Sequence, residues 1–177
     1  MSTTLYYSRS TASLVVHWLL IELGIPHELH ELDFDKRDQK SDDYLKLNPA
    51  GVVPTLVMDG QVITETAAIL MHLADTHPRA ELAPAVASMQ RAQYYRWMLF
   101  CANTLMPAYR AWFYSDEIAG EANVEATQQH ARAKLEKAWG QVADHLEAHG
   151  PYLLGAQRSA ADFLLTMLMR WSRNMPK

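Results

Sequence analysis

The stretch LNPAGVVPTLVMDGQVITETAAILMHLAD, residues 47–75, decides the fold. Two short apolar runs, 55–58 and 61–64, flank Asp59-Gly60, a pair of residues that strongly indicates a tight β-hairpin turn. Turn-forming residues occupy 48–54, and the apolar residues after position 65 have the spacing of a helix that ends before His77-Pro78. This stretch is therefore expected to form a loop, two antiparallel strands and a helix.

The residues before this stretch predict the rest of an α/β domain. TTLYYS (3–8) has the β-branched and aromatic content of a strand, and 11–23 is densely apolar and stops at Gly24 and Pro26. Residues 27–34 favour a second strand, and Ser41 can cap a short helix that ends at Leu47. The order β-α-β-α-β-β-α over residues 1–76 is typical of a thioredoxin-like domain.

After a polar linker at 77–85, the pattern is helical only. Residues 86–114 and 123–149 have helical spacing, and Gly150-Pro151 ends the second of these helices. Ser159 and Asp162 form a capping box before a last helix. The expected fold is an α/β thioredoxin-like N-terminal domain (1–76) followed by an all-α helical domain (86–177).

Composition excludes several function classes. The chain has 177 residues and a net charge of −4, so no basic surface favours nucleic acid or an anionic membrane. No apolar run reaches the length of a membrane span, and the N-terminus does not resemble a signal peptide. Cys101 is the single cysteine, which excludes an intrachain disulfide and fits a cytoplasmic protein.

Two positions in the 47–75 stretch could bind a peptide-like ligand. In a thioredoxin-like fold Pro54 would be cis and would turn the backbone of Val53 outward, whereas a trans proline at a strand start is the alternative. Glu65 and Thr66 sit at the expected start of a helix, where they could hold the ammonium and carboxylate groups of an amino acid. Plain capping of the helix is the alternative for this pair.

The same residues carry a family resemblance. The 47–75 stretch, with NP-x-G-x-VP and the Glu-Thr pair, is similar to the N-terminal domain of cytosolic glutathione transferases, and GPYLLGAQRSAADFLL (150–165) resembles their C-terminal signature. The resemblance implies that glutathione is the co-substrate and that the protein binds no metal. It implies backbone pairing of Val53, beside Pro54, with the cysteinyl residue of glutathione. It further implies that Glu65 and Thr66 hold the γ-glutamyl end and that Lys36 reaches the glycyl carboxylate.

The turn at 8–13 indicates how the thiol of glutathione would be activated. Bacterial beta-class members have a cysteine where this chain has Ala12, and their C-domain histidine falls on Met106, so a reductase activity is not expected. The turn is similar to that of zeta-class members, whose catalytic serine falls on Ser10 with Thr11 beside it. Tyr6 matches the tyrosine of other classes. A hydroxyl that donates a hydrogen bond and the N-terminus of a helix are sufficient to stabilise a thiolate.

The resemblance also implies a substrate class and an assembly. We expect conjugation of glutathione to an apolar electrophile, as in detoxification, with Tyr109 and Trp112 lining the electrophile pocket in a homodimer. Two alternatives stay open: a zeta-like isomerase that acts on a small dicarboxylate, and a non-catalytic binding module of the same fold. Family members usually continue for another helix after the position of Lys177, so a shorter C-terminal domain is expected.

HELHE (27–31) contains two histidines and two glutamates but lacks the spacing of a metal-binding motif.

Overall fold

The computed structural model describes residues 2–175, which form two compact units divided between Ala83 and Pro84. The first unit contains a four-stranded sheet and helices, and the second is helical. The fold is therefore that predicted from the sequence, a thioredoxin-like unit followed by an all-α unit.

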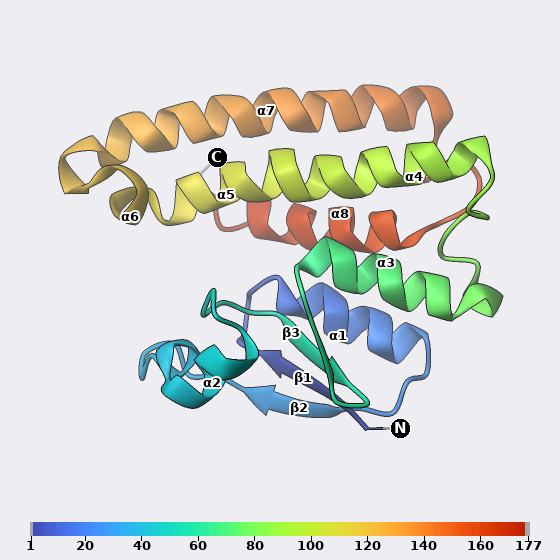
Figure 1. The fold of residues 1–177 in the computed structure, drawn as a ribbon. Coiled ribbons are helices and arrows are strands. Elements are labelled where there is room, and N and C mark those ends of the chain that lie inside the picture. Colours follow the sequence, from blue (N-terminus) through green and yellow to red (C-terminus); the bar gives the residue numbers. More distant parts are fainter. Residues whose placement is uncertain (1, 176–177) are drawn as a thin grey trace. The chain divides into compact units, whose positions relative to one another are not determined.

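The sheet has the strand order β2-β1-β3-β4 (Figure 1). Its strands are β1 (Thr3–Tyr7), β2 (Glu28–Glu31), β3 (Thr55–Met58) and β4 (Gln61–Thr64). Strand β1 pairs with β2 in parallel and with β3 in antiparallel orientation, and β3 pairs with β4 in antiparallel orientation. The predicted hairpin is confirmed, since Asp59 and Gly60 both adopt positive φ angles of 49° and 80°, as a tight hairpin turn of two residues requires.

The helices of the first unit are α1 (Ser13–Glu22), α2 (Asp42–Leu47) and α3 (Thr66–Thr76), with 3₁₀ turns η1 (Asp38–Lys40) and η2 (Pro78–Ala80). Helices α1 and α3 contact each other and lie side by side (Figure 1). Fully buried residues of the sheet and of both helices, including Leu5, Leu56, Leu19 and Ile69, form the core. This burial of apolar side chains provides the main stabilisation of the unit.

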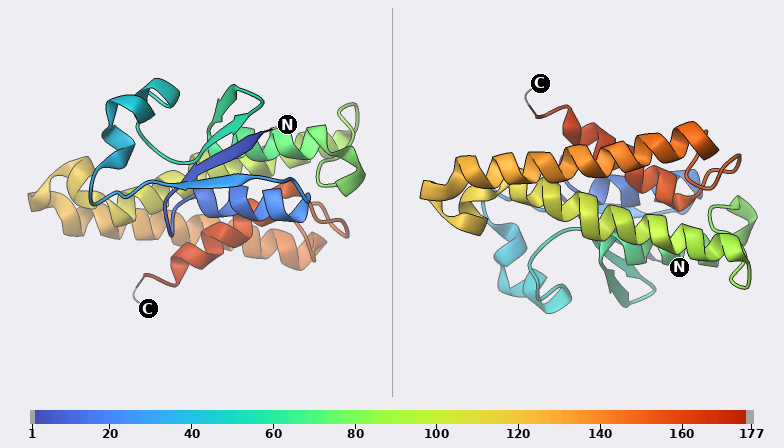
Figure 2. Two further views of the ribbon diagram at one scale, coloured as in Figure 1. Left: turned by 90° about the horizontal axis from the view of Figure 1, so that it is seen from below. Right: turned by 90° about the horizontal axis from the view of Figure 1, so that it is seen from above.

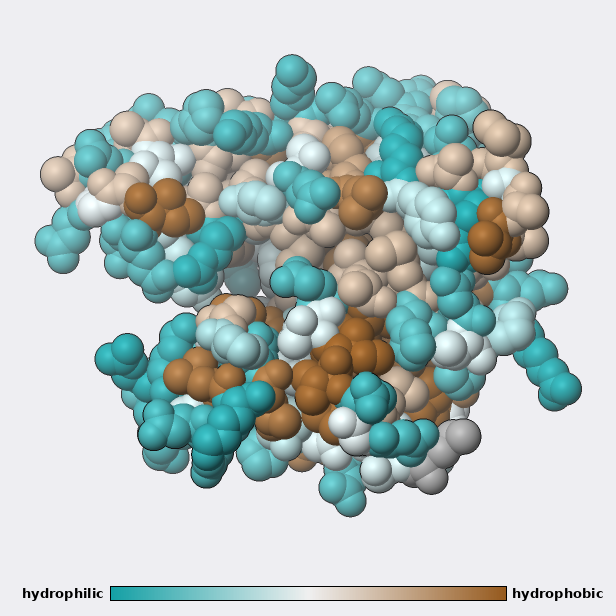
Figure 3. Space-filling view, in the orientation of Figure 1, coloured by the Kyte–Doolittle hydropathy of each residue, from teal (hydrophilic) through white to brown (hydrophobic). Residues whose placement is uncertain are grey.

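The helical unit contains two long helical runs that pack along each other (Figures 1 and 2). The first run comprises α4 (Met89–Phe100), a π-helical turn η3 (Cys101–Leu105) and α5 (Met106–Phe113), and the second is α7 (Val124–His149). The short elements α6 (Ser115–Ala119) and η4 (Glu121–Asn123) connect them, and α8 (Ala160–Ser172) follows. The side of α7 seen at the top of Figure 3 carries mostly hydrophilic side chains.

The long helix expected over 86–114 is thus present, but with a widened turn in its middle. At this turn the N–H of Met106 donates to the carbonyl of Cys101, five residues back, and Pro107 follows directly. Proline has no N–H to donate to the preceding turn, which is a common cause of such interruptions. Within residues 2–175, no helix is long and apolar enough to cross a membrane.

The capping box at the start of α8 is confirmed. The N–H of Ser159 donates to the Asp162 carboxylate at 2.7 Å, and the same carboxylate accepts the N–H of Leu153 at 2.8 Å. Asp162 therefore joins α8 to the preceding loop.

Cys101 is fully buried. Burial is the larger cause and the charge of Asp162 the smaller cause that raise the pKa of its thiol to about 12.

Candidate functional site

The register of the sheet brings the candidate residues of the first unit to one edge. Tyr6 of β1 is opposite Thr55 of β3, and Thr55 is opposite Thr64 of β4. Since these neighbours are antiparallel, β1 and β4 end at the edge where β3 begins. Ser10 follows the end of β1, Val53 precedes β3, and Glu65 follows β4, so all three lie close to this edge.

The turn between β1 and α1 contains hydroxyl groups that are hydrogen-bonded and hydroxyl groups that are not. Thr11 and Ser13 are engaged: both hydroxyls contact the Ser8 carbonyl, at 2.7 and 3.0 Å, and the Thr11 hydroxyl accepts the N–H of Ser13. Ser10 is exposed at a φ of 59°, and none of the hydrogen bonds of residues 2–175 involves its hydroxyl. The same holds for the Ser8 hydroxyl, which the sequence did not single out as a site residue.

Tyr6 is placed differently from Ser10. Its ring contacts His30 at a centroid distance of 4.7 Å and Tyr44 at 5.7 Å. The ring is half-buried, and no hydrogen bond to its hydroxyl is found within the described residues. Tyr6 therefore packs between β2 and α2, while Ser10 lies in the turn that enters α1.

The start of α1 can stabilise a negative charge. No hydrogen bond of the described chain is donated by the backbone N–H groups of Ser10, Thr11 or Ala12. These groups precede a ten-residue helix, whose N-terminus carries a partial positive charge. An anion beside Ser10 would meet free N–H donors and a free hydroxyl.

A buried network holds the loop before β3. The Val52 carbonyl accepts the Tyr44 hydroxyl at 2.6 Å and the Asn48 amide at 2.8 Å, and both side chains also contact the Thr55 hydroxyl. Burial raises the pKa of Tyr44, which stays a neutral donor at physiological pH. The Val53-Pro54 bond is cis, and neither the N–H nor the carbonyl of Val53 is hydrogen-bonded within residues 2–175. The loop therefore offers the backbone of Val53 as an unpaired strand position.

Glu65 occupies the N-cap position of α3 in an unusual conformation. Its φ is 67°, a left-handed value that is uncommon for a residue other than glycine, and its side chain makes no capping hydrogen bond. The side chain is exposed and has no ion pair within the described residues, while Thr66 beside it is 5% exposed. Because strained non-glycine residues cluster at ligand sites, this geometry favours binding over plain capping.

Two lysines after β2 have different contacts. Lys36 is paired with Asp33 at 3.0 Å, and this hydrogen bond raises the pKa of Lys36. Lys40, which the sequence analysis missed, donates to the Ala50 carbonyl at 3.3 Å. The Lys40 ammonium also lies close to Gly51: a Cβ atom added to Gly51 would be 2.7 Å from the Lys40 Nζ. The structure therefore places Lys40, not Lys36, against the loop that leads to Val53.

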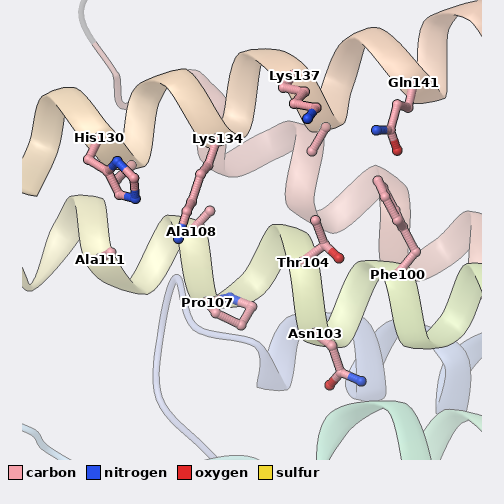
Figure 4. Close-up of a pocket in the computed structure, with 12 residues that line it drawn as sticks. Phe100, Asn103, Thr104, Pro107, Ala108, Ala111, His130, Lys134, Lys137 and Gln141 are labelled. Carbon is pink, nitrogen blue, oxygen red and sulfur yellow. The ribbon is translucent and has the colours of Figure 1, made fainter.

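The aromatic residues proposed to contact a substrate lie in the helical unit. Tyr109 is fully buried and accepts a hydrogen bond from the Trp139 indole at 3.0 Å, whereas Trp112 is half-buried. A groove of about 470 Å³ lies between α7 and the run from α4 to α5 (Figure 4). Neither Tyr109 nor Trp112 lines it. Lys134, Lys137 and His130 line the α7 side, and four alanines form much of its floor: Ala108, Ala111, Ala131 and Ala138.

Across the described residues, no group of three or more His, Cys, Asp or Glu side chains could hold a metal ion. Arg9, next to Ser10, is paired with Glu31 at 2.8 Å, and the Tyr7 hydroxyl donates to the same carboxylate. Arg9 is therefore already engaged in a surface ion pair.

Comparison with known proteins gives one consistent result. Residues 9–76 match the family described as "Glutathione S-transferase, N-terminal domain". The chain is 36% identical to the glutathione S-transferase GST-4.5 of Xanthomonas campestris, over 95% of this chain and 81% of that protein. It is 31% identical to a maleylacetoacetate isomerase of Dictyostelium discoideum, over 92% of this chain and 76% of that protein. A glutathione transferase homologue from Sulfitobacter was solved with bound glutathione. It superposes on this chain with a TM-score of 0.85 at 29% identity, over 98% of this chain and 83% of that one.

The buried network before β3 leads to a prediction about stability. Tyr44→Phe removes one hydroxyl that contacts the Val52 carbonyl and the Thr55 hydroxyl, while Asn48 still contacts both. We expect the free energy of unfolding to fall by about 1 kcal/mol, the usual net value of one buried hydrogen bond. Urea denaturation of the two proteins measures this difference.

Tyr95→Phe is the matched control for this substitution. Tyr95 is 39% exposed, and its hydroxyl has no hydrogen-bond partner within residues 2–175. Its removal should change the free energy of unfolding by less than about 0.5 kcal/mol. Equal losses in the two variants would contradict a stabilising role for the Tyr44 hydroxyl.

Proposed function

Because the chain belongs to the glutathione S-transferase family, we propose that its first unit binds glutathione at the edge where β3 begins and activates the thiol with Ser10. The activated thiolate attacks an apolar electrophile. Trp112 is proposed to contact the electrophile, since it has exposed surface, whereas Tyr109 is fully buried.

One observation carries this proposal: three different groups that are unpaired within residues 2–175 lie at the same sheet edge. Glu65 offers a carboxylate at the start of α3, Val53 offers a backbone N–H and carbonyl, and Ser10 offers a hydroxyl at the start of α1. Glutathione carries the complementary groups in the same order, an amino-acid end, a peptide backbone and a thiol. An extended ligand can pair with Val53 as an added strand.

The energy needed for thiol activation is within reach of these groups. A free cysteine thiol has a pKa of about 8.5, and lowering it by two units requires about 2.7 kcal/mol. A hydrogen bond to a charged acceptor contributes about 1.5–3 kcal/mol, and a helix N-terminus contributes about 0.3–1 kcal/mol. The Ser10 hydroxyl and the N-terminus of α1 together are therefore sufficient, and the chemistry needs no general base. The thiol proton passes to solvent water, and the thiolate forms the new C–S bond as the electrophile's leaving group departs with the bonding electrons.

The position of the two ends of glutathione follows from the register of β3 and β4. Thr55 is opposite Thr64, so Glu65, which binds the γ-glutamyl end, lies beside Pro54. With the cysteinyl residue at Val53, the glycyl end must extend the other way, along Val52 toward Gly51. Lys40 lies there, with its ammonium against Ala50 and Gly51. We therefore assign the glycyl carboxylate to Lys40 in place of Lys36.

Calorimetric titration of glutathione tests the central proposal. The wild-type chain should bind glutathione saturably, and Glu65→Gln should weaken binding by about tenfold or more, because the ammonium loses its carboxylate partner. Ser10→Ala should leave binding within about twofold but lower kcat with 1-chloro-2,4-dinitrobenzene by about tenfold to a hundredfold. Activity of Ser10→Ala equal to wild type would contradict the catalytic assignment. Binding with no turnover by the wild type would support the non-catalytic module.

The assignment of Lys40 is tested with a ligand that lacks the glycyl carboxylate. Lys40→Ala should weaken binding of glutathione by about fivefold to tenfold, yet leave binding of the dipeptide γ-glutamylcysteine nearly unchanged. Lys36→Ala is the matched control and should affect neither ligand by more than about twofold, since Lys36 is paired with Asp33. The reverse pattern would restore Lys36 as the binding residue.

A second candidate function is glutathione-dependent cis–trans isomerisation of a small dicarboxylate. The Dictyostelium relative named as a maleylacetoacetate isomerase favours it. An anionic substrate needs a cation near the thiol, and Arg9, the residue beside Ser10, is paired with Glu31. This pairing favours the transferase reaction over the isomerase reaction.

We also propose that the protein is a homodimer whose second copy covers the groove between α5 and α7. The alanines of its floor allow a partner surface to approach closely.

Analytical ultracentrifugation of the purified protein should give twice the mass of one chain. Thr104→Arg, which fills the groove, should shift the protein toward monomer, while Ala143→Arg on another face of α7 should not. A dimer that is insensitive to Thr104→Arg would place the interface elsewhere.

A further inference from the structure

We infer that Thr11 and Ser13 are positioning residues that act on the thiol through Ser10 and do not contact it themselves. This inference rests on the proposed function, because it concerns the hydroxyl that activates glutathione. It also resolves which hydroxyls of the crowded turn have a structural role.

The evidence is a closed cluster around the Ser8 peptide. The Ser8 carbonyl contacts the Thr11 hydroxyl at 2.7 Å and the Ser13 hydroxyl at 3.0 Å, and the two hydroxyls are 2.6 Å apart. The N–H of Ser8 donates to the Ser13 hydroxyl at 3.3 Å. Ser13 is 1% exposed, so this cluster reaches into the interior of the unit.

Both hydroxyl hydrogens of this cluster have an acceptor within it. Three oxygen–oxygen contacts connect the Ser8 carbonyl, Thr11 and Ser13, but the two hydroxyls supply only two hydrogens. Either both hydroxyls donate to the carbonyl, or one donates to the carbonyl and the other donates to its neighbour. In each arrangement a hydroxyl that turned toward a thiolate would give up a hydrogen bond inside the cluster.

The cluster also fixes the conformation of Ser10. Hydrogen bonds from Ser8 to Ser13 and from Thr11 to Ser8 close the turn around Ser10, which adopts a φ of 59° and has an exposed side chain. A left-handed conformation is unfavourable for serine by itself, so the surrounding contacts must hold it. Loss of the cluster should let Ser10 relax and misplace its hydroxyl relative to the thiol.

A double-mutant cycle distinguishes a positioning role from direct contact. The pKa of the thiol of bound glutathione is measured from the ultraviolet absorbance of the thiolate in wild type, Ser10→Ala, Thr11→Val and the double variant. Ser10→Ala should raise this pKa by about one unit, and Thr11→Val by a smaller amount. In the Ser10→Ala background, Thr11→Val should produce no further shift, because its effect passes through Ser10.

Thr11→Ser provides the rescue, since it keeps the hydroxyl and should restore both the thiol pKa and kcat. Thermal unfolding of each variant identifies any loss of folding, and KM for glutathione should stay within about twofold. An equal shift by Thr11→Val in both backgrounds would mean that Thr11 contacts the thiolate, and no shift in a folded Thr11→Val protein would also overturn the inference. Absence of glutathione binding by the wild type would contradict the proposed function itself.

Discussion

The antiparallel pairing of β3 with both β1 and β4 is the constraint on which the candidate site depends. This pairing makes β1 and β4 end where β3 begins, and it thereby places Ser10, Val53 and Glu65 at one edge of the sheet. A register shift of one residue would move Leu5 out of the core and Tyr6 into it. Burial of apolar residues therefore specifies the site as well as the stability of the unit.

Two polar networks then adapt this edge for binding. Tyr44, Asn48 and Thr55 hold the Val52 carbonyl, so the next residue is left with unpaired backbone groups. Thr11 and Ser13 satisfy the Ser8 peptide in the same way, and the Ser10 hydroxyl is left without a partner among the described residues. In both places hydrogen bonds are completed among neighbouring residues, and the residue between or beside them has no such bond within residues 2–175.

Local patterns in the sequence predicted most of the fold but only part of the site. The Asp59-Gly60 turn and the Ser159–Asp162 capping box are decided by neighbouring residues, so sequence spacing was sufficient. The contact of Lys40 with the Ala50 carbonyl spans ten residues, and the hydrogen bond that Tyr109 accepts comes from Trp139 of α7. The engagement of Thr11 depends on backbone angles that four adjacent hydroxyl residues do not reveal.

The burial of Cys101 has a consequence for a protein that handles reactive thiols. Burial raises the pKa of the Cys101 thiol to about 12, so this side chain stays a neutral thiol at physiological pH. The thiolate is the form that attacks disulfides, so oxidised glutathione finds no nucleophile in this chain. The burial of Cys101 therefore disfavours a mixed disulfide between this chain and glutathione.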